Sequence, residues 1–496
     1  MRPDAAVDIA VIGAGPAGLA AAVTAAAAGR RVALVDAAPR PGGQYYRHRS
    51  PVPEEGRRGG RGGGGVRGWE TFVRLRERLD EVSYLPGHRV WHVEPGFEPG
   101  FERGFEPGFV VHALAGDGDA ERAVVIRAGR LVLAPGAHDR ALPFPGWDLP
   151  GVLTAGAAQA LIKGNGVSPG VRAVIAGTGP FLLPVAAGMA AAGSTVAGVF
   201  EANRPYGFGA ALSRHPDRLT EGAGYAAALA RARIPYLMGR AVVAAHGDDS
   251  VAAVTVARLD AGWRPIAGTE RRVECDTVAV GYGFTPQLEL PLQLGCATTM
   301  AADGTLVVDV DAAQRTSVPG VYAAGEITGI GGAQLALVEG ELAALAAALP
   351  ADASAAAISA AAKAAAAKGL GWLLVRRRRL RAFAAAMNAA YAVRPGWPAW
   401  LRDDTVICRC EEVPYDRLAA AVDLGATDPR AVKLLSRAGM GWCQGRVCGY
   451  ATAALTARAT GRAPAAADLR GLAQRPIAQP IRLGDLAQEA QEKESP

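Results

Sequence analysis

Four of the six cysteines stand near the end of the chain in two short pairs. One residue separates Cys408 from Cys410, four separate Cys443 from Cys448, and 32 lie between the pairs. Four thiolates arranged in this way are able to hold one tetrahedral zinc ion or two bridged irons. Because zinc knuckles usually space paired ligands by two to four residues, the one-residue gap favours a [2Fe-2S] cluster. Zinc and unligated thiols are the alternatives.

A glycine loop near the start predicts a nucleotide site. The loop Gly13-Ala-Gly15-Pro16-Ala17-Gly18 lies between an expected strand (7–12) and an expected helix (19–28), and Asp36 closes the next strand. Gly13 allows the tight turn, Gly15 lets backbone approach a pyrophosphate, and Gly18 permits close helix packing. The helix N-terminus offers free N–H groups to the phosphates, and Asp36 is able to accept the ribose hydroxyls.

A second loop repeats this pattern further along the chain. Gly177, Gly179 and Leu182 take the three glycine positions, and Glu201 ends the following strand. Leu182 departs from the pattern, and its bulk is expected to hold the helix away from the strand. Three interpretations of this site are left open: it binds NAD(P), it binds another adenine nucleotide, or it is an empty structural remnant.

Three further motifs resemble those of two-dinucleotide flavoproteins. Residues 41–44, with Gly43 and Gln44, resemble the loop that lies against the flavin in that family. Residues 133–136, ending at Gly136, resemble its middle motif, and residues 316–326, with Gly325 and Glu326, resemble its closing motif. The resemblance implies FAD at the first site, with Glu326 near the ribityl chain. The second loop resembles the inserted NAD domain of glutathione-reductase-like flavoproteins.

The segments around the cysteines resemble the [2Fe-2S] domain of bacterioferritin-associated ferredoxins. The whole order of motifs is similar to the larger subunits of opine oxidases, hydroxyproline dehydrogenases and hydrogen cyanide synthase. This resemblance implies an FAD and [2Fe-2S] electron-transfer subunit of an amino-acid, opine or amine dehydrogenase, with a glycine-oxidase-like flavoprotein partner that oxidises the C–N bond. The alternatives are a self-contained NAD(P)H-dependent flavin reductase and, less favoured, a non-catalytic iron-handling protein.

The expected fold class is α/β, a two-dinucleotide-binding-domain flavoprotein with a small, mostly helical C-terminal domain. The expected parts are an FAD domain (1–152 and 283–349, with low-complexity inserts near 50–68 and 95–109), an inserted NAD(P)-type domain (153–282), an Ala/Arg-rich helical linker (350–403), a [2Fe-2S] domain (404–465) and a tail (466–496). Helices are expected at 415–424 and 428–435, between the cysteine pairs.

The remaining features limit the function classes. The chain has a formal net charge of +6, with basic runs at 57–67 and 376–381 that we interpret as solvated surface, and no nucleic-acid-binding motif is recognised. Glycine and proline interrupt the longest uncharged stretches, so no membrane span is expected, and a cytoplasmic location follows from the missing signal peptide. Cys275 and Cys296 are interpreted as buried structural thiols, and His138 and Asp139 as loop residues near the flavin motif. Catalytic residues are not assigned.

Overall fold

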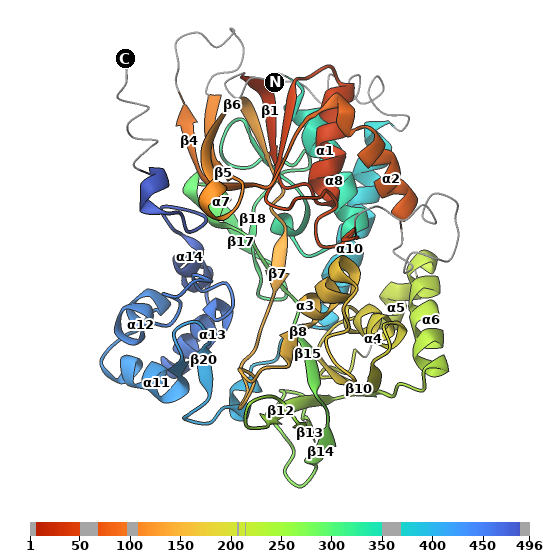
Figure 1. Cartoon of the computed structure of the whole chain (residues 1–496), viewed down its shortest axis with the longest axis vertical. Helices are drawn as coiled ribbons and strands as arrows, with labels where there is room; N and C mark the ends of the chain where they lie inside the picture. Colours follow the sequence, from red (N-terminus) through yellow and green to blue (C-terminus); the bar gives the residue numbers. More distant parts are fainter. Residues whose placement is uncertain are drawn as a thin grey trace.

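The computed structural model describes residues 6–49, 68–96, 108–205, 208–213, 215–349 and 369–486. Two Rossmann-like α/β units follow each other along the long axis, and a small helical unit lies beside them (Figure 1). The predicted fold class is confirmed by this arrangement.

The first unit is built on a seven-stranded sheet in the order β3-β2-β1-β6-β5-β4, with β19 also paired to β6. Its parallel part comprises β1 (Val7–Ile12), β2 (Val32–Asp36), β3 (Ser83–Pro86), β6 (Arg122–Leu133) and β19 (Val321–Ala323). The long strand β6 also pairs with an antiparallel hairpin of β4 (His88–Gly96) and β5 (Gly108–Ala115). The sheet therefore joins a nucleotide-binding half to an antiparallel half.

Two Ala-rich helices, α1 (Pro16–Ala27) and α8 (Ala333–Ala347), pack against each other on the first sheet. A Cβ atom on Gly340 would lie 2.1 Å from the carbonyl oxygen of Ala17, so the two helix backbones nearly touch. This close approach fixes the start of α1, where the glycine loop ends.

The second unit has a five-stranded parallel sheet in the order β11-β10-β9-β15-β8. Its strands are β8 (Val152–Thr154), β9 (Arg172–Gly177), β10 (Thr195–Glu201), β11 (Tyr236–Met238) and β15 (Thr277–Gly281). Helices α3 (Ala155–Ala160), α4 (Leu182–Ala191), α5 (Phe208–Ser213) and α6 (Pro216–Arg231) accompany it, and β12 (Arg240–His246), β13 (Ala253–Arg258) and β14 (Arg271–Glu274) form a separate antiparallel sheet. The chain thus contains the inserted second unit that the repeated loop predicts.

The chain crosses between the two units on a pair of antiparallel strands, β7 (Ala137–Asp139) and β16 (Phe284–Pro286). The expected boundary at residues 152/153 therefore lies after the first crossing strand, and the one at 282/283 lies just before the second. Phe144 and Trp147, which lie between β7 and the boundary at 152/153, are buried in the core of the second unit together with Phe200.

The expectation of a linker at 350–403 needs correction, because the described part of this segment is packed into the molecule. Helix α10 (Leu370–Ala390) packs on α8, and its Leu373 lies in a shared apolar cluster with Leu342. After the helix, Trp397 and Trp400 lie in the main core, where Trp400 donates a hydrogen bond to the carbonyl oxygen of Trp263 at 2.9 Å. Residues 369–403 therefore form a strap over both units.

The C-terminal unit contains β20 (Val406–Cys408), β21 (Val413–Pro414), α11 (Tyr415–Asp423), α12 (Pro429–Ser436), α13 (Gly449–Ala459) and α14 (Ala466–Ala473). The two helices predicted between the cysteine pairs are α11 and α12. The expected tail (466–496) needs correction, because α14 packs through Leu469 and Ala473 against the core of the first unit. Residues 487–496 lie outside the described residues.

The low-complexity inserts fall largely outside the described residues, as does the basic run at 57–67. The insert near 95–109 is interpreted from its sequence as a hairpin tip or loop; in the structure Pro95 pairs with Phe109 and Gly96 with Gly108 as the ends of the hairpin strands β4 and β5. These ends are strand rather than loop, because each is held by cross-strand pairing. In the part of the chain that is described, no helix is long and apolar enough to cross a membrane.

The short helix α7 (Glu289–Gln293) and the hairpin of β17 (Thr298–Met300) and β18 (Leu306–Val308) continue from β16. They lie between the first unit and the C-terminal unit, close to α14.

Candidate functional site

The first glycine loop has the shape that a pyrophosphate requires. Gly13 has a φ of +102°, and a Cβ there would lie 2.3 Å from the carbonyl oxygen of Ala134. A Cβ on Gly18 would lie 1.7 Å from the carbonyl oxygen of Gly13, whereas one on Gly15 would meet nothing within 4 Å. Two glycines are therefore required by the fold, and Gly15 leaves open space at the N-terminus of α1, where Pro16 is the first helical residue.

Asp36, at the end of β2, has one carboxylate oxygen without a hydrogen-bond partner among the described residues. Backbone N–H groups of Ala14, Ala37 and Ala38 face its carboxylate, yet its buried Oδ2 has no hydrogen-bond partner among the described residues. Burial raises the pKa of this carboxyl to about 6, against the effect of those N–H groups. A ribose hydroxyl donating to Oδ2 would satisfy the atom and favour the ionised form.

The two other flavin-type loops flank this space. Gly43 has a φ of +57°, and a Cβ there would lie 2.8 Å from the Cα of Gly15, so residues 41–44 lie directly over the glycine loop. Gln44 is exposed and accepts a hydrogen bond from Arg47. Gly136, with a φ of +82°, has nothing within 4 Å of its Cβ position. Gly15 and Gly136 thus have open space at their Cβ positions, and Gly43 lies against Gly15.

The closing motif follows β19. Gly325 has a φ of +79°, and a Cβ there would lie 3.0 Å from the Cβ of Ala17, so the motif lies against the start of α1. The carboxylate of Glu326 accepts hydrogen bonds from the N–H groups of Gly331 at 3.1 Å and Gly332 at 2.8 Å. Burial raises the pKa of Glu326 to about 7. Glu326 therefore fixes the turn into α8, and its contact with a ribityl chain remains a prediction.

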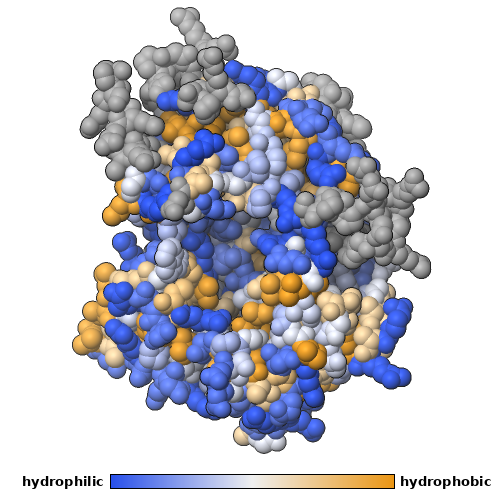
Figure 2. Space-filling model, viewed as in Figure 1, coloured by the Kyte–Doolittle hydropathy of each residue, from blue (hydrophilic) through white to orange (hydrophobic). Residues whose placement is uncertain are grey.

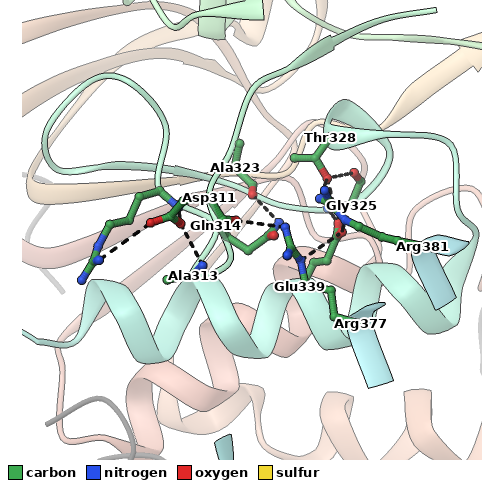
Figure 3. Close-up of polar contacts among 10 residues, drawn as sticks. Asp311, Ala313, Gln314, Ala323, Gly325, Thr328, Glu339, Arg377 and Arg381 are labelled. Atoms are coloured by element: carbon green, nitrogen blue, oxygen red, sulfur yellow. Dashed lines mark hydrogen bonds and ion pairs between the residues drawn. The ribbon is translucent and has the colours of Figure 1, made fainter. Parts of the chain in front are cut away.

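A buried carboxylate that sequence reasoning missed holds this motif in place. Glu339 of α8 is completely buried and accepts hydrogen bonds from the N–H of Gly325 at 3.0 Å and the hydroxyl of Thr328 at 2.8 Å. Arg381 of α10 donates to the other oxygen at 2.7 Å, and Arg377 lies 3.8 Å from it (Figure 3). The available signal was an acid within an apolar helix, followed by an arginine run. The strap is thus fastened to the flavin-type motif.

The second glycine loop is built like the first. Gly177 is required, because a Cβ there would lie 1.8 Å from the carbonyl oxygen of Gly281, and Gly179 has a φ of +103°. Leu182 is buried in the core of the unit, and its Cδ2 would lie 3.6 Å from a Cβ on Gly281. Leu182 is thus buried in the core of the unit while the turn keeps its form despite the missing third glycine.

The acid of the second loop behaves differently from Asp36. Glu201 is completely buried, and its Oε2 accepts a hydrogen bond at 2.8 Å from the N–H of Gly179, the position that corresponds to Gly15. Its Oε1 accepts from the N–H of Asn203 at 2.8 Å. Burial raises the pKa of Glu201 to about 7, partly offset by these N–H groups. The donor that would bind a pyrophosphate is thus already satisfied by the chain.

The strap also covers this loop. Asn203 donates to the hydroxyl of Thr178 at 2.8 Å and to the carbonyl oxygen of Ala392 at 3.0 Å. The Thr178 hydroxyl in turn donates to the carbonyl oxygen of Tyr391 at 3.2 Å. Residues that follow α10 therefore close over the loop of the second unit, whereas the described strap leaves the space above Gly15 open.

The four clustered cysteines converge in two pairs. Cys408, in β20, and Cys448, before α13, are buried and hydrogen-bonded thiol to thiol. Cys410 is exposed and interacts with the half-buried Cys443. The N–H of Gly439 donates to the sulfur of Cys408 at 3.4 Å. Sequence spacing pairs 408 with 410, but the fold pairs each of them with a cysteine of the second segment.

The surroundings favour thiolate at Cys408. The hydrogen bond from Cys448, followed by backbone N–H groups that include that of Gly439, lowers the pKa of Cys408 to about 6. Within the described ranges, no group of three or more histidine, cysteine or acidic side chains is gathered tightly enough to hold a single metal ion. The four sulfurs also interact across the pairs, since Cys410 interacts with Cys408 and Cys448 with Cys443.

The other singled-out residues have structural surroundings. Cys275 and Cys296 are buried, and burial raises the pKa of both thiols, to about 11 for Cys275. Asp139 accepts hydrogen bonds from the Thr154 hydroxyl and from the N–H of Gly156 at 3.1 Å, so it anchors the start of α3. His138 lines a recess beside the crossing strands, which is described below.

Comparison with known proteins agrees with this geometry. A family model described as pyridine nucleotide-disulphide oxidoreductase matches residues 7–348, and one described as BFD-like [2Fe-2S] binding domain matches residues 406–458. The chain is 36% identical to the HcnB subunit of hydrogen cyanide synthase from Pseudomonas aeruginosa over 91% of this chain and 93% of that protein. It is 34% identical to an opine oxidase subunit from Agrobacterium tumefaciens over 97% of this chain and 91% of that protein. A crystal structure of L-proline dehydrogenase from P. horikoshii shares the fold, with a TM-score of 0.62 at 19% identity over 97% of this chain and 79% of that one.

Proposed function

The chain belongs to the pyridine nucleotide-disulphide oxidoreductase family, as an FAD-dependent oxidoreductase subunit with a BFD-like [2Fe-2S] binding domain, and we propose that it carries electrons away from a partner flavoprotein that oxidises a C–N bond. The substrate class is an amino acid, an opine or a related amine. The observation that carries the proposal is the contrast between the two glycine loops of this chain.

The first loop suits FAD. The orphaned Oδ2 of Asp36, the empty space at Gly15 and the free N-terminus of α1 are the acceptor, the room and the donors that an adenosine diphosphate needs. Gly43 and Gly136 extend this space toward the crossing strands β7 and β16. FAD bound there would be able to accept an electron pair and to release electrons one at a time.

The cysteine unit suits a [2Fe-2S] cluster. Cys408 and Cys448 would hold one iron and Cys410 and Cys443 the other, because these are the pairs that lie together. The N–H of Gly439 donates to a ligand sulfur, an interaction that raises the potential of such a cluster. Bound there, the cluster supplies one-electron transfer.

Electron entry from NADH is disfavoured by the second loop. The N–H of Gly179 is bonded to Glu201, and the strap lies over Thr178 and Asn203. A nucleotide would have to displace a fully buried carboxylate and break these hydrogen bonds before it could bind, which makes the site unfavourable. The inserted unit then serves as a framework for the strap and for the cluster unit.

The relatives support an external source of electrons, since HcnB and the opine oxidase relative are both named as subunits of larger enzymes. On the partner, the carbon that bears the amine loses a hydride and the nitrogen loses a proton, giving an imine. The partner's flavin would accept this hydride. On this chain, the FAD that the first glycine loop and Asp36 would hold would supply acceptance of the electron pair, and the cluster that the four cysteines would hold would supply one-electron transfer. This chain's residues bind and orient both centres and hold them in one rigid framework.

The proposal is tested by purifying the chain anaerobically with and without its native partners. We expect a second flavoprotein to co-purify, and amine substrates to bleach the flavin of this chain only in that complex. Rapid bleaching by NADH alone, in a chain without any associated flavoprotein, would instead identify a self-contained reductase.

A further inference from the structure

A polar recess lies between the first unit and the cluster unit. Figure 2 shows it as a hollow with hydrophilic walls near the centre of this face, between α14 and the crossing strands. The recess opens to solvent. Its charged lining comprises Arg140, Glu289, Arg446 and Arg475, with His138 and Tyr450 beside them.

Several side-chain nitrogens around this recess make no hydrogen bond to the described residues. The buried Arg140 donates to Thr305 at 2.7 Å and lies 4.3 Å over the ring of Tyr450, yet its Nε makes no hydrogen bond within the described residues. The same holds for Nε and Nη1 of Arg475. Neither ring nitrogen of His138, which lies beside the backbone of Arg446, has a well-formed hydrogen bond to any described residue. Buried donors left unpaired cost free energy, so such a cluster calls for an acceptor.

The charge balance gives the sign of that acceptor. Glu289 is the one carboxylate in the described lining; it lies 2.9 Å from Arg446 and 3.9 Å from Arg475. Three guanidinium groups around one carboxylate give the side chains of the lining itself a net positive charge. Guanidinium groups bind carboxylate and phosphate through paired hydrogen bonds, so an oxyanion fits both the charge and the donors.

Apolar side chains from both sides also line the recess. Pro286, Leu288 and Leu306 face it from the first unit, and Leu469 and Leu472 from α14. Concave sites that combine apolar walls with a few converging polar groups are typical of small-molecule binding. The ligand is thus expected to pair an anionic head with a short apolar body.

We propose that this recess is a second ligand site, separate from the two glycine loops, which binds a small organic carboxylate or phosphate. Its anionic head would take the free N–H groups of Arg140, Arg475 and His138. The inference does not depend on the electron donor. It concerns the cluster, however, because Arg446 lies between Cys443 and Cys448, and Arg475 Nη2 lies 3.8 Å from the Cβ position of Gly445. An occupied site would therefore change the surroundings of the cluster.

The test is calorimetric titration of the anaerobically purified holoprotein with inorganic phosphate, hexanoate and hexanol. We expect one saturable site per chain for phosphate or hexanoate and none for hexanol. Saturation by phosphate alone would identify a phosphate ligand, and saturation by hexanoate with weaker acetate binding would identify a carboxylate with an apolar tail. The visible circular dichroism of the cluster should change with the same midpoint.

Variants separate this site from general anion binding. Arg475→Gln is expected to weaken binding about 10-fold or more, because it removes a charged hydrogen-bond donor. Arg470→Gln, at an exposed position of the neighbouring helix α14, is the matched control and should bind as wild type. Should the Arg475 variant fail to fold, protection of Arg475 from phenylglyoxal by the ligand in wild type provides the same information. The absence of saturable binding, equal binding in both variants, or no protection would overturn the proposal.

Discussion

Replacement of Glu201 by glutamine tests the closed second loop most sharply. Burial raises the pKa of Glu201 from an ordinary value of 4.5 to about 7. Between those values the unfolded chain binds fewer protons at this residue than the folded chain, so stability falls as pH rises and the loss is complete above the folded pKa. The linkage relation gives a loss of about 2.5 kcal/mol between about pH 5 and about pH 8. Glutamine does not titrate and removes this slope.

The assay is urea unfolding of wild type and Glu201→Gln across that pH range, followed by hydrogen exchange of peptides from β9 and β10 so that the inserted unit is monitored by itself. The lost hydrogen bond changes the free energy of unfolding by the same amount at every pH. The prediction concerns the part of the difference between the two proteins that varies with pH. Glu274→Gln, at an exposed position of the same unit, is the control and should show no such change. A flat difference for Glu201→Gln, or a wild type that gains stability relative to it as pH rises, would refute the reasoning.

Three further substitutions test the remaining parts of the account. Gly15→Ala should fold normally, because its Cβ meets no protein atom, but should bind FAD about 10-fold more weakly. The control Gly188→Ala, in α4, should leave FAD affinity unchanged. Fluorescence titration of the apoprotein with FAD measures both affinities. Cys443→Ser should lose iron and sulfide but retain flavin, as measured by metal analysis and absorbance, and retention of full iron would contradict the assigned ligand set. Arg381→Gln should cost about 1.5–3 kcal/mol, because it removes a charged hydrogen bond to the buried carboxylate of α8, whereas the exposed Arg378→Gln should cost little; thermal unfolding compares the two.

Local geometry was the part of the site that the sequence predicted well. The turn at Gly13, the contact at Gly18 and the pairing of strand, loop and helix follow from residue types within a few positions of each other. The helices between the cysteine pairs were predicted for the same reason. Each of these features depends on neighbours in the sequence, so the pattern alone carries the information.

The features that were missed depend on distant residues. Asp36 and Glu201 have the same position in their loops, yet Oδ2 of Asp36 has no hydrogen-bond partner among the described residues, whereas Oε2 of Glu201 accepts from the N–H of Gly179. In addition, Tyr391 and Ala392, far along the chain, accept hydrogen bonds from Thr178 and Asn203 and cover the second loop. The pairing of Glu339 with Arg381 is likewise tertiary, and no local spacing predicts it.

The domain boundaries show the same limit. Trp397 and Trp400 lie in a stretch that composition marks as a linker, but they are buried beside Trp263. Large apolar side chains in an apparent linker were the one available signal, because aromatic residues of that size bury much apolar area when they can. The strap thereby connects both nucleotide units with the cluster unit.

The central claim is that one polypeptide holds both FAD and a [2Fe-2S] cluster. The most direct measurement is an anaerobic titration of the purified chain with dithionite, followed by absorbance and by low-temperature electron paramagnetic resonance. Because the flavin takes two electrons and the cluster one, the account predicts uptake of about three electrons per chain and the resonance of a reduced [2Fe-2S] centre. Uptake of about two electrons with bound zinc and no such resonance, or a protein without flavin, would contradict it.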